Sequence, residues 1–213
     1  MAPTKTTLLV KFNHMKRTLI PAVLLAGLLA VPAQERLSRE EALKYAFIAS
    51  SDLKEMLQTP IPTDPDVKRP VALKDDQHGG LVLPESKLSA DTFAKAGKEA
   101  TSVGQLWLHK LAPVKEGNVV SQSRLRMVHL RAGDQEGDAA CCALGVSKDA
   151  NRGLELLIYG KDKEPLMRVP LKAISGQQDN PIEMSCEREG DNGLVTLKFL
   201  GKYAATFAVT EPE

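Results

Sequence analysis

Hydrophobic and polar positions alternate along the second half of the chain. From about residue 103 onward, short apolar runs with a period of two are separated by turn-forming residues, which is typical of strands with one buried face. The predicted strands span 104–112, 119–131, 139–146, 153–160, 165–171, 182–188, 193–200 and 202–210. This spacing predicts a mainly β domain over 101–213, an antiparallel β-sandwich that is jelly-roll-like or barrel-like. Asn192-Gly193 is the clearest hairpin turn, because both residues tolerate positive φ.

A helical period precedes this region, in an N-terminal helical segment at 34–60. Ser38 and Glu41 have the spacing of a capping box, and Pro60 ends the pattern. The apolar stripe of this amphipathic helix, over 38–58, is made of Leu43, Ala46, Phe47, Ser50, Leu53 and Leu57. We expect the stripe to pack on the β domain, and docking on a partner protein is the alternative.

Residues 61–100 predict a linker, a hairpin and a short helix. Four prolines between 60 and 70 favour an extended segment. The apolar runs 71–73 and 81–83 flank a polar stretch that ends in Gly79-Gly80, which indicates a hairpin. Residues 89–96 favour a short helix that Gly97 closes.

The first 33 residues differ in composition from the rest. Their formal charges are all positive, and an apolar run from Leu19 to Val31 follows the basic residues and leads to Val31-Pro32-Ala33. A basic start, an apolar core and small residues before a cut define a secretory signal peptide. We expect cleavage after Ala33, with Met1 or Met15 as the start, and a periplasmic or secreted protein. An uncleaved anchor is the alternative, but the run is shorter than the roughly 20 residues of a membrane span.

The charge of the mature chain is nearly balanced. Without residues 1–33 it carries 24 basic and 27 acidic side chains, a net charge of −3, which gives no general attraction to nucleic acid or anionic membranes. No later segment is long and apolar enough to span a bilayer.

Three cysteines occur, at positions 141, 142 and 186. Alternation places Cys142 on one face with Leu144 and Val146, and Cys186 on one face with Ile182 and Met184. Because an exported protein meets an oxidising compartment, we expect Cys142–Cys186 to be the pair if a disulfide forms. Buried free thiols are the alternative.

Catalytic and cofactor motifs are absent from the sequence. It has no Gly-x-x-x-x-Gly-Lys phosphate loop, and Asp149 replaces the second glycine of a nucleophile elbow after Ser147. His109 and His129 lie on strands predicted to be neighbours, but two imidazoles without a third ligand are a weak zinc site. No metal or cofactor is therefore predicted.

A local basic patch is the remaining candidate site. It consists of Lys110, Arg124, Arg126 and Arg131, with no acidic residue between 120 and 133. Such a patch can bind an anion or an acidic partner, and the alternative is an edge strand kept soluble by charge.

Two functions remain open. The first is an exported, non-enzymatic binding, accessory or structural protein of the bacterial cell envelope, with an unknown protein partner or small ligand. The second is a small carrier of an apolar ligand, or a small enzyme, with its site between the N-terminal helix and the sheet. A cavity at that place would favour the second.

Overall fold

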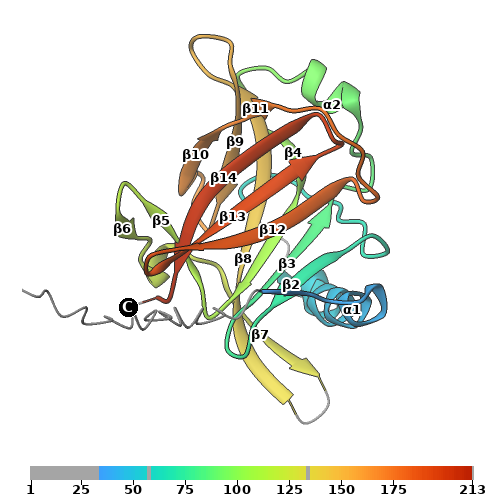
Figure 1. Ribbon diagram of the computed structural model, residues 1–213, viewed down its shortest axis with the longest axis vertical. Coiled ribbons are helices and arrows are strands. Elements are labelled where there is room, and N and C mark those ends of the chain that lie inside the picture. The colour runs from blue at the N-terminus through green and yellow to red at the C-terminus, as the bar shows by residue number, and fades with distance from the viewer. Residues whose placement is uncertain (1–33, 57–58, 133–134, 213) are drawn as a thin grey trace, which may run out of the picture. The chain divides into compact units, whose positions relative to one another are not determined.

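Two antiparallel sheets are the main elements of the part of the chain that the structure describes. The structure is a computed structural model that describes residues 34–56, 59–132 and 135–212 (Figure 1). The larger sheet has the order β1-β2-β3-β4-β8-β9-β10, with β7 also paired to β8. Its strands are β1 (Glu35–Arg36), β2 (Val71–Lys74), β3 (Gly79–Pro84), β4 (Thr101–His109), β7 (Met127–Ala132), β8 (Gln135–Lys148), β9 (Leu154–Tyr159) and β10 (Met167–Pro170).

The smaller sheet has the order β12-β13-β14-β5-β6, with β11 also paired to β14. Its strands are β5 (Ala112–Lys115), β6 (Asn118–Val119), β11 (Lys172–Ala173), β12 (Ile182–Glu189), β13 (Asn192–Phe199) and β14 (Tyr203–Thr210). The mainly β, antiparallel class predicted from the sequence is therefore confirmed. The barrel-like variant is wrong, because the two sheets do not close on each other.

The main hydrophobic core lies between the sheets. Alternation directs Leu106 and Leu108 of β4 inward, and they belong to the same buried cluster as Leu197 and Phe199 of β13. The short helix α2 (Ala90–Ala94) adds the buried Phe93 to this cluster. The chain changes sheet at three corners, after β4, after β6 and after β10. Lys110 forms the first corner with a φ of 54°.

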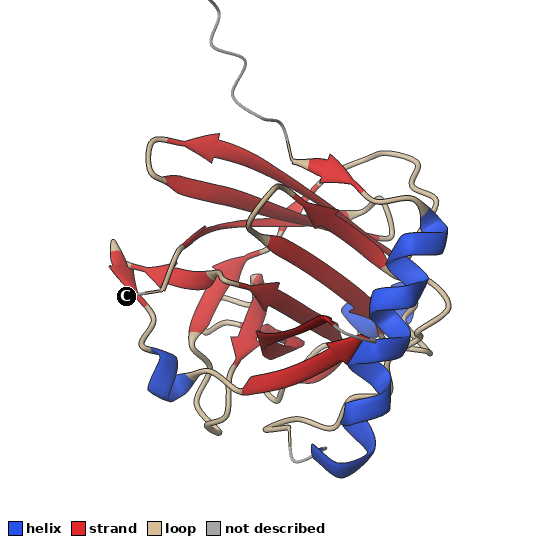
Figure 2. Ribbon diagram, turned by 90° about the horizontal axis from the view of Figure 1, so that it is seen from below, coloured by secondary structure: helices blue, strands red, loops and turns tan. Residues whose placement is uncertain are grey.

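The helix α1 (Arg39–Met56) covers the opposite, outer face of the larger sheet; it is the long helix on the right of Figure 2. At its start, Ser38 Oγ donates to Glu41 Oε2 over 2.8 Å, and the backbone N–H of Glu41 donates to Ser38 Oγ over 3.3 Å. These hydrogen bonds to Ser38 lower the pKa of the Glu41 carboxyl.

The face of α1 that packs on the sheet agrees only in part with the predicted stripe, which included both Ala46 and Phe47. Ala42, Ala46 and Ala49 are buried there, whereas Phe47 is 57% exposed. Small side chains let the helix backbone approach the sheet closely, so the helix turns its alanines, and not its largest apolar residues, toward the strands. Leu53 and Leu57 lie outside the part of the chain whose side chains the structure describes.

The segment 61–100 is built into the larger sheet. β2 and β3 form a hairpin, and β3 pairs along its whole length with β4. The predicted signal peptide at 1–33 lies outside the described residues. No helix among the described residues is long and apolar enough to cross a membrane.

Two strand predictions are wrong in detail. The strand predicted at 119–131 is interrupted by the 3-10 helix η1 (Gln122–Arg124), because Ser121 Oγ accepts the backbone N–H of Ser123 and turns the chain. The hairpin between β12 and β13 turns at Gly190 and Asp191, two residues before the predicted Asn192-Gly193. Glu189 pairs with Asn192, and Gly190 takes the positive φ of 60°.

Candidate functional site

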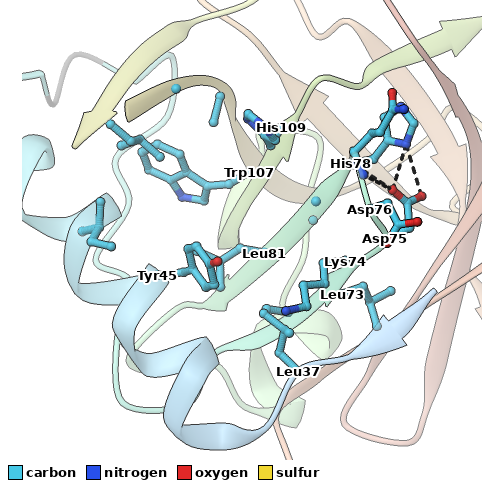
Figure 3. Close-up of a pocket in the computed structure, with 18 of the residues that line it drawn as sticks. Leu37, Tyr45, Leu73, Lys74, Asp75, Asp76, His78, Leu81, Trp107 and His109 are labelled. Carbon is cyan, nitrogen blue, oxygen red and sulfur yellow. Dashed lines mark hydrogen bonds and ion pairs between the residues drawn. The ribbon is translucent and has the colours of Figure 1, made fainter. Parts of the chain in front are cut away.

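A pocket of about 310 Å³ opens on the outer face of the larger sheet. Figure 3 shows it between α1, the β2–β3 hairpin and the strands β4 and β8. Its lining includes Leu37, Tyr45, Ile48, Ala72, Lys74, Gly79, Leu81, Trp107, His109, Leu130, Gly137 and Ala139. This volume lies at the lower end of the range for small-molecule sites, which is about 300 to 1,000 Å³.

The strand register builds the floor of the pocket from two rows of directly opposed residues, which share a face of the sheet. The inner row is Ala72, Leu81 and Trp107, and the outer row is Lys74, Gly79, His109 and Ala139. In the outer row, large side chains therefore alternate with small ones across β2, β3, β4 and β8. The hollow lies where the small side chains leave the surface uncovered.

Two glycines make room beside His109. A Cβ at Gly79 would lie 3.7 Å from His109 Cβ, and one at Gly137 would lie 3.2 Å from His109 Cε1. The imidazole therefore occupies space that side chains at these two positions would restrict. Glycine at both positions keeps the outer end of the pocket open.

Trp107 forms the bottom of the pocket, and a hydrogen bond to Gln105 fixes its indole ring. Its Nε1–H donates to Gln105 Oε1 over 3.2 Å, and Gln105 Nε2 donates to Thr63 Oγ1 over 2.8 Å. The indole is only 2% exposed, whereas Tyr45 at the mouth is 47% exposed. The pocket therefore has a buried aromatic residue, Trp107, at its bottom and an exposed one, Tyr45, at its mouth (Figure 3).

His109 offers one hydrogen-bonding atom to the pocket. Its Nδ1 lies 2.9 Å from the backbone oxygen of Asp138. A carbonyl oxygen accepts hydrogen bonds and cannot donate them, so Nδ1 carries the proton. Nε2 of the neutral ring is then an acceptor for a ligand hydroxyl or amine.

The acidic groups at the rim are engaged by other parts of the protein. Asp75 accepts the backbone N–H groups of Gln77 and His78 over 2.9 and 2.7 Å, and both its oxygens lie 3.1 Å from His78 Nδ1. Burial favours the neutral carboxyl, but these hydrogen bonds outweigh it and lower the pKa of Asp75. His78 Nε2 lies 3.0 Å from Glu211 Oε1, so the hairpin is also tied to the C-terminal segment.

The residues of the predicted basic patch come from separate elements of the fold. Arg124 lies in η1 and pairs with Asp162 at 3.6 Å, and Arg131 lies on β7 and pairs with Glu136 at 3.7 Å. The backbone oxygen of Arg126 accepts the N–H of Cys141 over 2.8 Å, and Lys110 is the corner residue after β4. The four residues of the predicted patch therefore lie on different elements, and Arg124 and Arg131 each lie near a carboxylate.

The two histidines considered for a metal site lie on opposite faces of the larger sheet. The expectation that their strands are neighbours is wrong, because β8 lies between β4 and β7. His109 is opposed to Ala139 and His129 to Asp138, and adjacent residues of β8 point to opposite faces. Within the described residues, no group of three His, Cys, Asp or Glu side chains can hold a metal ion.

His129 has a carboxylate partner of its own, which gives a prediction. Its Nδ1 lies 2.9 Å from Asp138 Oδ1, and this hydrogen bond raises the pKa of His129 above the ordinary value of 6.5. Its stabilising contribution is therefore complete below pH 6.5 and is lost as the pH rises through the raised pKa. In an NMR titration of the His129 ring, we expect Asp138→Asn to bring the midpoint down toward 6.5. An unchanged midpoint would show that Asp138 is not the cause.

The three cysteines are free thiols in this structure. Cys142 and Cys186 both pack on the core between the sheets, but the disulfide considered from the sequence is not formed. Cys142 is opposed to Leu106 in the larger sheet, and Cys186 to Val195 in the smaller one. Burial raises the pKa of the Cys142 thiol to about 12, so the thiol is protonated and unreactive near neutral pH.

The thiol state can be counted directly. Protein purified without reductant and unfolded in guanidinium chloride is expected to react with Ellman's reagent at all three cysteines, because none is bonded in the folded chain. A count of one thiol would instead establish an intramolecular disulfide. Peptide mapping would then identify the pair.

Most residues of the pocket were not identified from the sequence. The sequence pattern places Gly79 and Leu81 in a hairpin and makes His109 a weak metal candidate, whereas it gives Tyr45 and Trp107 no role in a site. Trp107 and His109, two residues apart on a strand and therefore on one face, are the local signal of this site. The sequence gives no local sign that His109 pairs with Gly79 and Trp107 with Leu81, because these pairs depend on the register between β3 and β4.

Comparison of the chain with protein-family models, with curated proteins and with solved structures finds no match.

Proposed function

We propose that this protein is an exported, non-catalytic binding protein that holds a small, largely apolar ligand in the pocket beneath α1. The observation that carries the proposal is the combination of Trp107, Leu81 and Tyr45 around a hollow of about 310 Å³. Binding sites of this kind pair an apolar lining with a few fixed polar groups. Here His109 Nε2 and Lys74 are the polar groups, and the sequence of the first 33 residues supports export.

Binding without catalysis accounts for the chemistry of the lining. The described residues around the pocket include no serine, threonine or cysteine to act as a nucleophile. The carboxylate of Asp75 is held by His78 and by backbone N–H groups, which stabilise its ionised form and make it a poor proton donor. The arrangement is suited to holding an apolar molecule in place.

The packing of α1 is consistent with a cover over a ligand. Ala42, Ala46 and Ala49 bring the helix close to the sheet, while Tyr45 and Ile48 reach the pocket. A ligand would thus contact the helix and the sheet together.

A role as an accessory protein of the cell envelope is the second candidate. The observation that favours it is Phe47, which is 57% exposed on α1. A large apolar side chain at the surface is suited to contact with a partner protein.

The ligand-binding proposal can be tested with fluorescence, because Trp107 is the single tryptophan of the chain. Titration with the neutral dye N-phenyl-1-naphthylamine is expected to raise the dye emission and quench Trp107 by energy transfer. Native mass spectrometry of protein purified from its own cell envelope would show a retained natural ligand.

A variant with a filled pocket tests the site, and the same substitution elsewhere on the protein is its matched control. In Gly79→Leu the added Cβ makes ordinary contacts of 3.7 and 3.8 Å, so the leucine fills the pocket without a clash at its base. We expect dye affinity to fall at least about tenfold, with the melting temperature nearly unchanged. In Gly97→Leu, where a Cβ would meet nothing within 4 Å, binding should stay as in the wild type. Equal binding by all three proteins would reject the pocket as the site.

A further inference from the structure

We infer that the ligand carries an anionic head group, which the ammonium of Lys74 binds at the mouth of the pocket; this inference rests on the proposed function. Four residues with formal charges line the pocket: Lys74, Asp75, Asp76 and Glu136. By number alone, a cation would be favoured. The contacts of each group lead to the opposite conclusion.

Two of the three carboxylates already have positive or donating partners. Asp75 accepts backbone hydrogen bonds and lies against the His78 ring, as described above. Glu136 lies 3.7 Å from Arg131 Nε and 3.5 Å from His129 Nε2. Asp76 is exposed at the tip of the β2–β3 turn, where water solvates its charge. The carboxylates of Asp75 and Glu136 therefore already have partners within the protein, and that of Asp76 is solvated.

Lys74 differs from them in its contacts. It is half-buried, and within the described residues no carboxylate lies within 4 Å of its ammonium. Its neighbour Glu41, whose carboxylate it attracts from a greater distance, is held by Ser38. Figure 3 shows the Lys74 side chain directed toward Leu37 and away from Asp75. Lys74 is thus the charge at the mouth that a ligand can match.

The register places Lys74 suitably for this role. Lys74, Gly79 and His109 are directly opposed on three successive strands, so the gap above Gly79 has a positive group on one side and the imidazole on the other. A carboxylate or sulfonate on the Lys74 side of Gly79, away from the accepting Nε2 of His109, would accept hydrogen bonds from Lys74, while an apolar ring system extended toward Leu81 and Trp107. The ligand class is therefore a small amphipathic acid.

A matched pair of dyes separates the head group from the apolar body. 1-Anilinonaphthalene-8-sulfonate has the ring system of N-phenyl-1-naphthylamine with one sulfonate added. We expect the wild type to bind the sulfonate more tightly than the neutral dye. Lys74→Gln should weaken binding of the sulfonate about tenfold, the loss of one charge-assisted hydrogen bond, and weaken binding of the neutral dye much less, because that dye carries no charge. Lys115→Gln, which removes an exposed lysine of β5, should change neither affinity.

The outcomes distinguish the two proposals. If both dyes bind equally well and Lys74→Gln changes neither affinity, the anionic head group is wrong and the apolar pocket stands. If neither dye binds, or if Gly79→Leu binds both dyes as well as the wild type does, the proposed function and this inference are both overturned. Tighter binding of the sulfonate that is lost in Lys74→Gln and kept in Lys115→Gln supports both.

Discussion

Replacement of Phe93 with alanine is expected to lower the free energy of unfolding by about 3 to 5 kcal/mol, the range for a large aromatic residue removed from a core. Phe93 is 1% exposed. Its ring stacks on Tyr203 with centroids 4.9 Å apart and tilts against Phe199 at 5.7 Å. The truncation would remove these contacts and leave a cavity where α2 meets the smaller sheet.

The chain offers a matched control in Phe47, which is 57% exposed on α1. The same change, Phe47→Ala, should alter stability by no more than about 0.5 kcal/mol, because little area returns to water. Urea unfolding followed by circular dichroism would measure both variants. Similar losses for the two would show that α2 does not anchor the core through Phe93.

Replacement of Gly104 with alanine is expected to cost about 3 kcal/mol or more, because clash and backbone strain act together. Gly104 has a φ of 154° at an irregularity in the pairing of β4 with β8. An added Cβ would lie 2.3 Å from the backbone oxygen of Leu83 and 3.2 Å from Ile182 Cδ1. The backbone oxygen cannot move away without disturbing the pairing of β3 with β4.

Gly97→Ala is the control for this substitution, since nothing lies within 4 Å of a Cβ at that position. Thermal unfolding of the two variants should therefore separate steric conflict from the general effect of replacing glycine. A melting temperature of Gly104→Ala close to that of Gly97→Ala would mean that the irregular pairing of β4 with β8 accommodates the added methyl group without strain. Because Gly104 is adjacent to Gln105, dye binding by any folded Gly104→Ala protein would also report whether the support of Trp107 survives.

The sequence predicted the strands best where alternation is bounded by turn residues. The predicted ranges 182–188, 193–200 and 202–210 agree with β12, β13 and β14 to within about a residue at each end. The strand predicted at 119–131 failed, because a side-chain hydrogen bond at Ser121 turns the chain and apolar periodicity does not register such local bonds.

The pocket could not be predicted, because it depends on contacts between distant segments. Gly79, His109 and Ala139 become neighbours through the register of three strands, and no single segment carries that information. The helix face was partly misassigned for a related reason. Hydrophobicity favours Phe47 as a buried residue, but close approach of a helix to a sheet favours side chains the size of Ala46.

The adjacent cysteines of β8 have a consequence for the kinetics of local opening. Cys141 belongs to the cluster beneath α1, and Cys142 to the core between the sheets, because neighbouring residues of a strand point to opposite faces. Each thiol can therefore be alkylated only when its own side of the sheet opens. Under native conditions, the modification rate at Cys141 would report detachment of α1, and the rate at Cys142 would report separation of the sheets. A bound ligand beneath α1 would slow the first rate and leave the second nearly unchanged. Two successive residues therefore report separately on the opening of the α1 face and of the core between the sheets.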